Sequence, residues 1–91
     1  MTRKIHLLIS GKVQGVCFRV NAKQKAIELG LNGWVKNTFD NKVEILAEGE
    51  ENKLREMIEW CYDGSNGAVV DEVEAEWMKA EEKFDKFEII V

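Results

Sequence analysis

The sequence predicts an α+β domain in which two helices cover one face of a single antiparallel sheet. Two observations support this prediction. Alternating apolar and polar residues, typical of half-buried strands, are separated by two stretches in which apolar residues recur at helical spacing. The chain has 91 residues, too few for two independent hydrophobic cores, so we expect residues 1–91 to form one domain.

The first half of the chain predicts a strand, a helix and a hairpin. Ile5, Leu7 and Ile9 take alternate positions over 4–10, which gives the first strand one buried face. Apolar residues recur at helical spacing over 18–29, and Gly30 follows as the end of the helix. The apolar residues are Phe18, Ala22, Ala26 and Leu29. A strand over 31–38 and a turn over 39–42 follow, and alternation resumes over 43–48 in Val43, Ile45 and Ala47.

The second half predicts a helix and two strands. Helical spacing over 50–62 is set by Leu54, Met57, Ile58 and Cys61, and the polar segment 63–67 ends the helix. Over 72–77, glutamates alternate with Val73, Ala75 and Trp77. A polar connection over 80–86 leads to a last strand over 87–91. We expect one face of this strand to hold Phe87, Ile89 and Val91.

These apolar faces are all buried if both helices pack on the same face of one sheet. The arrangement is a ferredoxin-like split β-α-β sandwich, with the order β-α-β-β-α-β plus a C-terminal strand. Proteins of this fold bind RNA, bind metals, regulate or catalyse, so the function has to be inferred from a site.

Composition and charge exclude several classes of function. The net charge is −4, with 17 acidic and 13 basic residues, so the chain lacks the broad basic surface of a nucleic-acid-binding protein. Its apolar runs are too short for a membrane span or a signal peptide. The one histidine and the two cysteines, Cys17 and Cys61, lack zinc-site spacing. We therefore expect a cytoplasmic monomer with reduced thiols, no metal or cofactor, and no nucleic-acid or membrane partner.

The loop between the first strand and the first helix, residues 11–19, is the leading candidate for a functional site. Gly11 and Gly15 permit backbone angles that turn successive N–H groups toward one point. The helix adds free N–H groups and the positive end of its dipole, and Arg19 in its first turn can bind a phosphate through two donors. These features describe a cradle for a small tetrahedral anion.

The loop by itself leaves a second interpretation open, because turn geometry alone also explains the glycines and a first-turn arginine often only meets solvent. The segment is not a Walker A loop, since no Lys-Ser or Lys-Thr pair follows the second glycine. Its glycine spacing also differs from that of a dinucleotide-binding fingerprint.

Two motifs make the chain resemble the acylphosphatase family. The segment GKVQGVCFR, residues 11–19, resembles the first signature of that family, and GLNGWVKNT, residues 30–38, resembles the second. The resemblance covers nearly the whole chain, including the second helix, the strand Val69–Trp77 and the ending over 87–89.

The resemblance implies roles for specific residues. Arg19 corresponds to the arginine that binds the substrate phosphate, and Asn37 to the asparagine that orients the attacking water. The backbone N–H groups implied to bind the phosphate with Arg19 are those of Lys12, Val13, Gln14, Gly15, Val16 and Cys17. The family's substrates are small acyl phosphates such as 1,3-bisphosphoglycerate, carbamoyl phosphate and acetyl phosphate, and water attacks phosphorus in line without a metal ion or a covalent intermediate.

One position in the hairpin turn departs from the family pattern. Where the family often has Asp-Gly, this chain has Asp40 followed by Asn41. Asparagine tolerates a left-handed backbone better than most residues, so we expect the turn to form at small cost and the chemistry to be unaffected.

Other residues that suggest chemistry have simpler interpretations. His6 is isolated on a strand and is expected to be structural. Cys17 is expected to fill space beside the loop, because a cysteine phosphatase needs five residues between its cysteine and its arginine, and only Phe18 stands there. The third strand has acids and no aromatics, which disfavours RNA binding. The glutamates over 72–77 are expected to form a solvated face.

Two other functions stay open beside the enzyme. One is a module that binds or transfers carbamoyl phosphate, as does the acylphosphatase-like domain of hydrogenase-maturation carbamoyltransferases, although the cysteine-rich metal motifs of those longer chains are missing here. The other is a non-catalytic domain for a protein partner, which the presence of Arg19 and Asn37 disfavours. Phosphate release distinguishes the enzyme from both.

Overall fold

The computed structural model describes residues 1–65 and 67–91. Its elements in chain order are β1 (Thr2–Lys12), α1 (Phe18–Glu28), β2 (Asn32–Asn37), β3 (Val43–Glu50), α2 (Glu51–Asp63), β4 (Val69–Lys79) and β5 (Phe87–Ile89). The order β-α-β-β-α-β followed by a short last strand confirms the predicted ferredoxin-like α+β fold.

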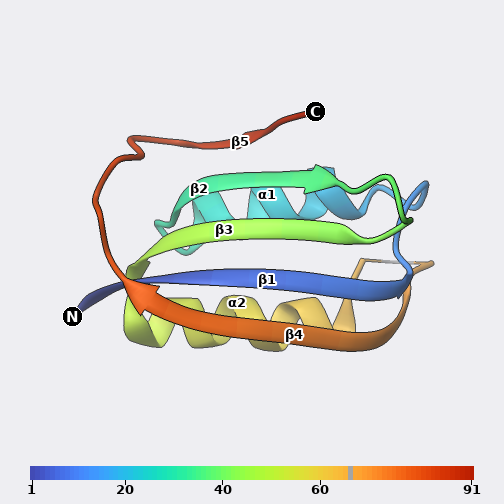
Figure 1. Ribbon diagram of the computed structural model, residues 1–91, viewed down its shortest axis with the longest axis horizontal. Coiled ribbons are helices and arrows are strands. Elements are labelled where there is room, and N and C mark those ends of the chain that lie inside the picture. Colours follow the sequence, from blue (N-terminus) through green and yellow to red (C-terminus); the bar gives the residue numbers. More distant parts are fainter. Residues whose placement is uncertain (66) are drawn as a thin grey trace.

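The strands form one sheet with the order β4-β1-β3-β2-β5, and both helices lie on the same face of it (Figure 1). β1 lies between β3 and β4 and is antiparallel to both, and β3 is also antiparallel to β2. The split β-α-β arrangement places β1, β3 and β2 in the interior of the sheet, with β4 at one edge and β5 at the other.

The prediction of a wholly antiparallel sheet is wrong for the last strand, because β5 is parallel to β2. β4 ends at the side of the sheet where β2 begins, and the connection over 80–86 runs along that side before β5 starts (Figure 1). β5 therefore enters beside the start of β2 and runs in the same direction. Asn32 supports this entry with a 3.1 Å hydrogen bond from its Nδ2 atom to the carbonyl oxygen of Phe84.

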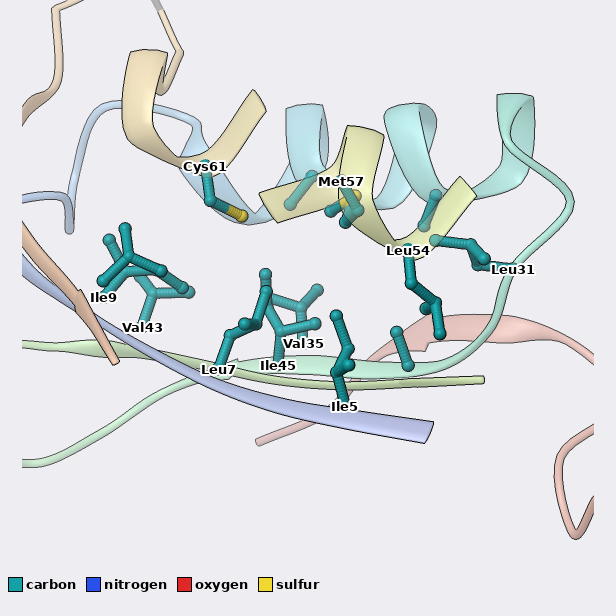
Figure 2. Packing of buried hydrophobic residues seen from close by; sticks show 14 of the residues in the cluster. Ile5, Leu7, Ile9, Leu31, Val35, Val43, Ile45, Leu54, Met57 and Cys61 are labelled. Atoms are coloured by element: carbon teal, nitrogen blue, oxygen red, sulfur yellow. The ribbon is translucent and has the colours of Figure 1, made fainter. Parts of the chain in front are cut away.

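The core lies between the sheet and the helices, as the alternation in the central strands predicts. Ile5, Leu7 and Ile9 are fully buried and point from the sheet toward the helices (Figure 2). The residues that meet them from the sheet and from both helices, all buried, are Val35, Val43, Ile45, Ala47, Phe18, Ala22, Ala26, Leu54, Met57 and Cys61. Gly30 ends α1 as predicted, with a φ of 73° and hydrogen bonds of the Schellman type at the helix end.

The edge strands follow their predicted alternation only in part. Phe87 is buried, but Ile89 is 36% exposed and Val91 lies beyond the end of β5 and is fully exposed. In β4, Val73 is buried whereas Ala75 is exposed. An edge strand has a neighbour on one side only, so the helices shield less of its inner face. No helix formed by the described residues is long and apolar enough to cross a membrane.

Candidate active site

Three segments meet at one end of the sheet. β1 ends there and the chain turns directly into α1, so the start of this helix lies beside the end of β1 (Figure 1). β2 runs parallel to β1, because both are antiparallel to β3, and so it also ends there. The fold thereby brings the loop over 13–17, the first turn of α1 and the end of β2 together.

The loop turns sharply before α1. Gly15 has a φ of 76° and Cys17 a φ of 60°, both in the left-handed region that glycine adopts freely and other residues rarely do. Cys17 is the N-cap of α1 and makes no side-chain hydrogen bond to the helix, and the first turn of α1 contains no acidic residue. The amide groups of residues 17–20 donate no hydrogen bond to an acceptor among the described residues. This helix start therefore offers free N–H groups and a positive partial charge to a ligand.

A hollow of about 290 Å³ opens beside this helix start. The residues that line it are Val13, Gly15, Cys17, Phe18, Arg19, Val20 and Asn37. The structure thus brings together Arg19, Asn37 and three of the six loop residues expected to bind phosphate, namely Val13, Gly15 and Cys17. Lys12, Gln14 and Val16 belong to the same turn of chain but do not line the hollow.

Arg19 and Asn37 face the hollow from different elements. Arg19 is partly exposed in the first turn of α1, and it forms no ion pair with any carboxylate among the residues described. Asn37 is the last residue of β2 and lies opposite Val43, a core residue, so it projects from the helix-covered face of the sheet. Its Oδ1 atom is buried and has no hydrogen-bond partner within the described part of the chain. The hollow is therefore lined by an arginine without an ionic partner among the described residues and by Asn37, whose buried Oδ1 no described group uses.

The side chain of Gln14 has a role that its sequence position did not indicate. Its Nε2 atom donates hydrogen bonds of 2.8 Å to the carbonyl oxygens of both Thr38 and Lys42. These two residues close the turn between β2 and β3, and Thr38 directly follows Asn37. Gln14 therefore joins the loop before α1 to the end of β2. No pattern within the sequence indicates this contact, which depends on how the two segments meet in the fold.

The turn itself forms despite its departure from Asp-Gly. Asn41 has a φ of 70°, the left-handed conformation that was expected of it. The amide of Thr38 donates to the carbonyl oxygen of Lys42 at 2.9 Å, and the hydroxyl of Thr38 donates to Asp40. That hydrogen bond is the main reason why the pKa of Asp40 lies below its ordinary value.

The two cysteines differ in their surroundings. Cys17 is exposed and lines the hollow, so the prediction that it fills space beside the loop is wrong. The left-handed backbone at Cys17 turns this residue outward at the helix start. Cys61 is buried on the inner face of α2, and the loss of hydration raises the pKa of its thiol to about 12. Both cysteines are free.

The other residues that suggested chemistry lie away from the hollow. His6 is paired with Glu44 through a 2.6 Å contact on the sheet face that the helices leave open. Glu72, Glu74 and Glu76 are exposed on the edge strand β4. Among the described residues, no group of three or more histidine, cysteine or acidic side chains is placed to hold a metal ion.

The fold and the hollow together define a class of protein: a ferredoxin-like domain whose strand–helix loop, first-turn arginine and neighbouring asparagine surround a space suited to a small anion. Comparison with known proteins makes this class specific. The Acylphosphatase family model matches residues 5–89. An acylphosphatase of Marinobacter nauticus is 55% identical over 82 residues, which are 90% of this chain and 89% of that protein.

Solved structures agree with the family model. The crystal structure of acylphosphatase from Bacillus subtilis matches with a TM-score of 0.95 and 36% identity, and each chain is covered completely. A crystal structure of full-length HypF, in a phosphate- and nucleotide-bound form, matches with a TM-score of 0.88 and 26% identity, but this chain spans only 12% of that one. The chain belongs to the acylphosphatase family, whose members are acid-anhydride hydrolases. The predicted enzyme class is thereby confirmed.

Proposed function

We propose that this protein hydrolyses small acyl phosphates to a carboxylate and inorganic phosphate without a metal ion. In this proposal Arg19 and the backbone N–H groups of Lys12, Val13, Gln14, Gly15, Val16 and Cys17 bind the phosphoryl group, and Asn37 orients the attacking water. The observation that supports it best is the shared hollow, which brings together Asn37, Arg19 and the start of α1, where Arg19 pairs with no described carboxylate and the first amides of the helix donate to no described acceptor.

Phosphoryl binding is an electrostatic task that these groups suit. The transferred phosphoryl group holds charge on its three non-bridging oxygens, and donors fixed in advance stabilise that charge without reorganising. Arg19 offers two N–H donors in one charged, planar group. The amides of the first turn of α1 lie at the positive end of the helix dipole. Each charge-assisted hydrogen bond contributes about 1.5–3 kcal/mol.

Asn37 suits the positioning of water and not its deprotonation. A carboxamide oxygen accepts a hydrogen bond from water but does not take up a proton at neutral pH. With the carboxamide of Asn37 as its hydrogen-bond partner, the water can direct one lone pair at phosphorus, in line with the acyl oxygen. The water oxygen forms the new bond to phosphorus as the bond to the acyl oxygen breaks, and the carboxylate leaves with the bonding electrons. We propose that the water proton passes to a phosphoryl oxygen of the substrate, because none of the described side chains that line the hollow is a carboxylate or an imidazole.

Little further assistance is needed, since a carboxylate is already a good leaving group and does not require protonation by a general acid. Positioning and charge stabilisation are therefore sufficient for an anhydride. An ordinary phosphate ester, whose leaving group is far more basic, would react poorly in the same site. The proposal accordingly restricts the substrate to acyl phosphates.

The test measures hydrolysis of benzoyl phosphate in the presence of EDTA by the wild-type protein and by Arg19→Ala and Asn37→Ala. Arg55→Ala, an exposed arginine on α2, is the matched control, and p-nitrophenyl phosphate is the ester control. Turnover of the anhydride by the wild type and Arg55→Ala, with both site variants nearly inactive, supports the proposal. Turnover lost on addition of EDTA contradicts the metal-independent mechanism, and a wild type without turnover contradicts the enzyme.

A binding module for carbamoyl phosphate or for a protein partner is the alternative, because the same fold occurs as a small part of the much longer HypF chain. Such a module would bind the ligand stoichiometrically and release no phosphate. We further propose that residues 1–91 act as one domain, as a cytoplasmic monomer without nucleic-acid or membrane partners. Sedimentation equilibrium at the mass of one chain, 10.5 kDa, checks the monomer.

A further inference from the structure

A serine outside both signature motifs contacts the loop that forms the hollow. Ser65 lies in the connection between α2 and β4 and is only 7% exposed. Its Oγ atom donates a 3.0 Å hydrogen bond to the carbonyl oxygen of Val16. The carbonyl oxygen of Ser65 accepts a hydrogen bond of 2.9 Å from the amide of Ala68, which fixes the serine in its own turn.

The hydrogen bond from Ser65 fixes the orientation of one peptide unit. The peptide bonds between described residues are all trans, and in a planar trans peptide the C=O and N–H groups point in opposite directions. Because Ser65 holds the Val16 carbonyl oxygen, the N–H group of Cys17 in the same peptide unit points away from Ser65. Cys17 lines the hollow together with Arg19 and Asn37.

We propose that Ser65 is a positioning residue for phosphate binding, which holds the Val16–Cys17 peptide with its N–H group toward the hollow. This inference rests on the proposed function, in which the Cys17 amide is one of the phosphate donors. Ser65 does not line the hollow itself and acts through the peptide that it binds.

This peptide needs an external restraint because of the backbone on either side of it. Rotation of the Val16–Cys17 peptide changes ψ of Val16 and φ of Cys17. Cys17 has a φ of 60°, in the left-handed region that residues other than glycine rarely adopt, so rotation of the peptide would release Cys17 from an unfavourable conformation. A rotated Val16–Cys17 peptide would direct the Val16 carbonyl oxygen at the hollow, where its negative end would repel a phosphate. Ser65 opposes that rotation, since the rotated carbonyl would lose its hydrogen bond.

The connection that holds Ser65 lies directly against the start of α1. A methyl group placed on Gly64 would lie 3.4 Å from Cε2 of Phe18, the first residue of the helix. On Gly67 it would lie 3.8 Å from Cγ1 of Val16. The connection therefore packs behind the loop, and the serine hydroxyl reaches Val16 from a supported position.

The test compares the two serines of the chain. Ser65→Ala deletes the hydroxyl that binds Val16. Ser10→Ala is the matched control, because the Oγ atom of Ser10 is also buried and has no hydrogen-bond partner among the described residues. Ser65→Thr keeps a hydroxyl and is the rescue variant. Dissociation constants for inorganic phosphate are measured by titration of backbone amide NMR signals, and KM and kcat are measured with benzoyl phosphate.

We expect Ser65→Ala to weaken phosphate binding and raise KM by about 10-fold, with a smaller change in kcat. The Cys17 amide signal, which shifts on phosphate addition to the wild type, should shift much less in this variant. Ser10→Ala should bind phosphate within about twofold of the wild type, and Ser65→Thr should restore most of the affinity. A merely structural effect would lower the unfolding midpoint and leave the Cys17 response unchanged.

Three outcomes overturn the inference. They are wild-type phosphate affinity in Ser65→Ala, an equal loss in Ser10→Ala, or a full Cys17 shift in Ser65→Ala. A wild-type protein that neither binds phosphate nor hydrolyses benzoyl phosphate contradicts the proposed function, and the inference falls with it. The two failures are distinguishable, because the first appears only in the variants and the second already appears in the wild type.

Discussion

The two ends of the sheet use their polar groups in opposite ways. At the end where β4 meets the connection to β5, Oε2 of the buried Glu48 accepts hydrogen bonds from the amides of Glu81 and Glu82, at 2.7 and 3.0 Å. Lys4, which lies opposite Glu48 in the register between β1 and β3, binds Glu81. At the other end, the amides that start α1 and the Oδ1 atom of Asn37 have no partner among the described residues. At the first end the polar groups mostly hold the chain, apart from Oε1 of Glu48, which also has no partner among the described residues, whereas at the other end they stand unused around the hollow.

This difference separates stability from function within one small domain. Unpaired polar groups cost stability unless a ligand or water satisfies them. A helix start without an acidic or capping side chain, as α1 has at Cys17, forgoes the stabilisation that such groups usually contribute. The same omission leaves room for an anion. The comparison therefore predicts that substitutions at the two ends affect different measurements.

The largest effect is expected for Arg19→Ala. Removal of the charged donor pair from the hollow should lower kcat/KM for benzoyl phosphate by about 10³-fold. The free energy of unfolding should change by no more than about 0.5 kcal/mol, since Arg19 is partly exposed and forms no ion pair with the described carboxylates. Steady-state kinetics and urea unfolding measure the two quantities. A large loss of stability with retained kcat/KM would reverse the assignment of the two ends.

The opposite pattern is expected for Glu48→Ala. This substitution leaves the amides of Glu81 and Glu82 without their acceptor and should lower the free energy of unfolding by about 1–3 kcal/mol. The kinetic constants should stay within about twofold of the wild type, because Glu48 lies at the far end from the hollow. Glu74→Ala, an exposed position on β4, is the control and should change neither. If Glu48→Ala loses activity and keeps the free energy of unfolding of the wild type, then Glu48 serves activity and not stability, which contradicts this prediction.

A smaller effect is expected for Gln14→Ala, which tests how the functional end is assembled. The variant loses both hydrogen bonds to the turn after β2, so the segment that holds Asn37 becomes less well positioned. We expect kcat to fall by about 10-fold with little change in KM, because water positioning and not phosphate binding is disturbed. Gln24→Ala, an exposed residue on α1, is the control. A rise in KM at constant kcat would instead show that the Gln14 side chain holds the phosphate-binding loop and not the segment of Asn37.

The sequence predicted the fold for reasons that are local, whereas Asn37 became a candidate site residue only through the resemblance to the family. Alternation in the central strands and helical spacing in α1 and α2 determine which faces are buried, and the order of the elements then places Arg19 and Asn37 at the same end of the sheet. Gly30 and Asn41 took their left-handed conformations because their residue types favour them.

What the sequence did not predict depends on contacts between distant segments. The direction of β5 follows from the path of the connection over 80–86, whose hydrogen bonds to Glu48 and Asn32 join residues far apart in the chain. The contacts of Gln14 and Ser65 are of the same kind, with a side chain on one connection binding a carbonyl oxygen on another. The exposure of Cys17 depends on its left-handed backbone at the start of α1, which a cysteine does not signal. Neither spacing nor residue type reveals such contacts.

The smallest effect concerns acid stability, and it compares one carboxylate at each end. Hydrogen bonds from Lys4 and Lys83 hold the pKa of Glu81 below its ordinary value of 4.5, and the hydrogen bond from Thr38 does the same to the pKa of Asp40. A lowered pKa in the folded state adds stability that is present above the ordinary pKa and is lost as the pH falls through the folded-state pKa.

The unfolding free energy of the wild type should therefore decrease between about pH 5 and pH 3, and less steeply in Glu81→Gln and in Asp40→Asn. Both carboxylates are exposed, so each difference should be small and should shrink at high salt. Urea unfolding at several pH values measures the slopes. Equal slopes in all three proteins at low salt would show that neither carboxylate contributes, and that the acid sensitivity arises from other carboxylates.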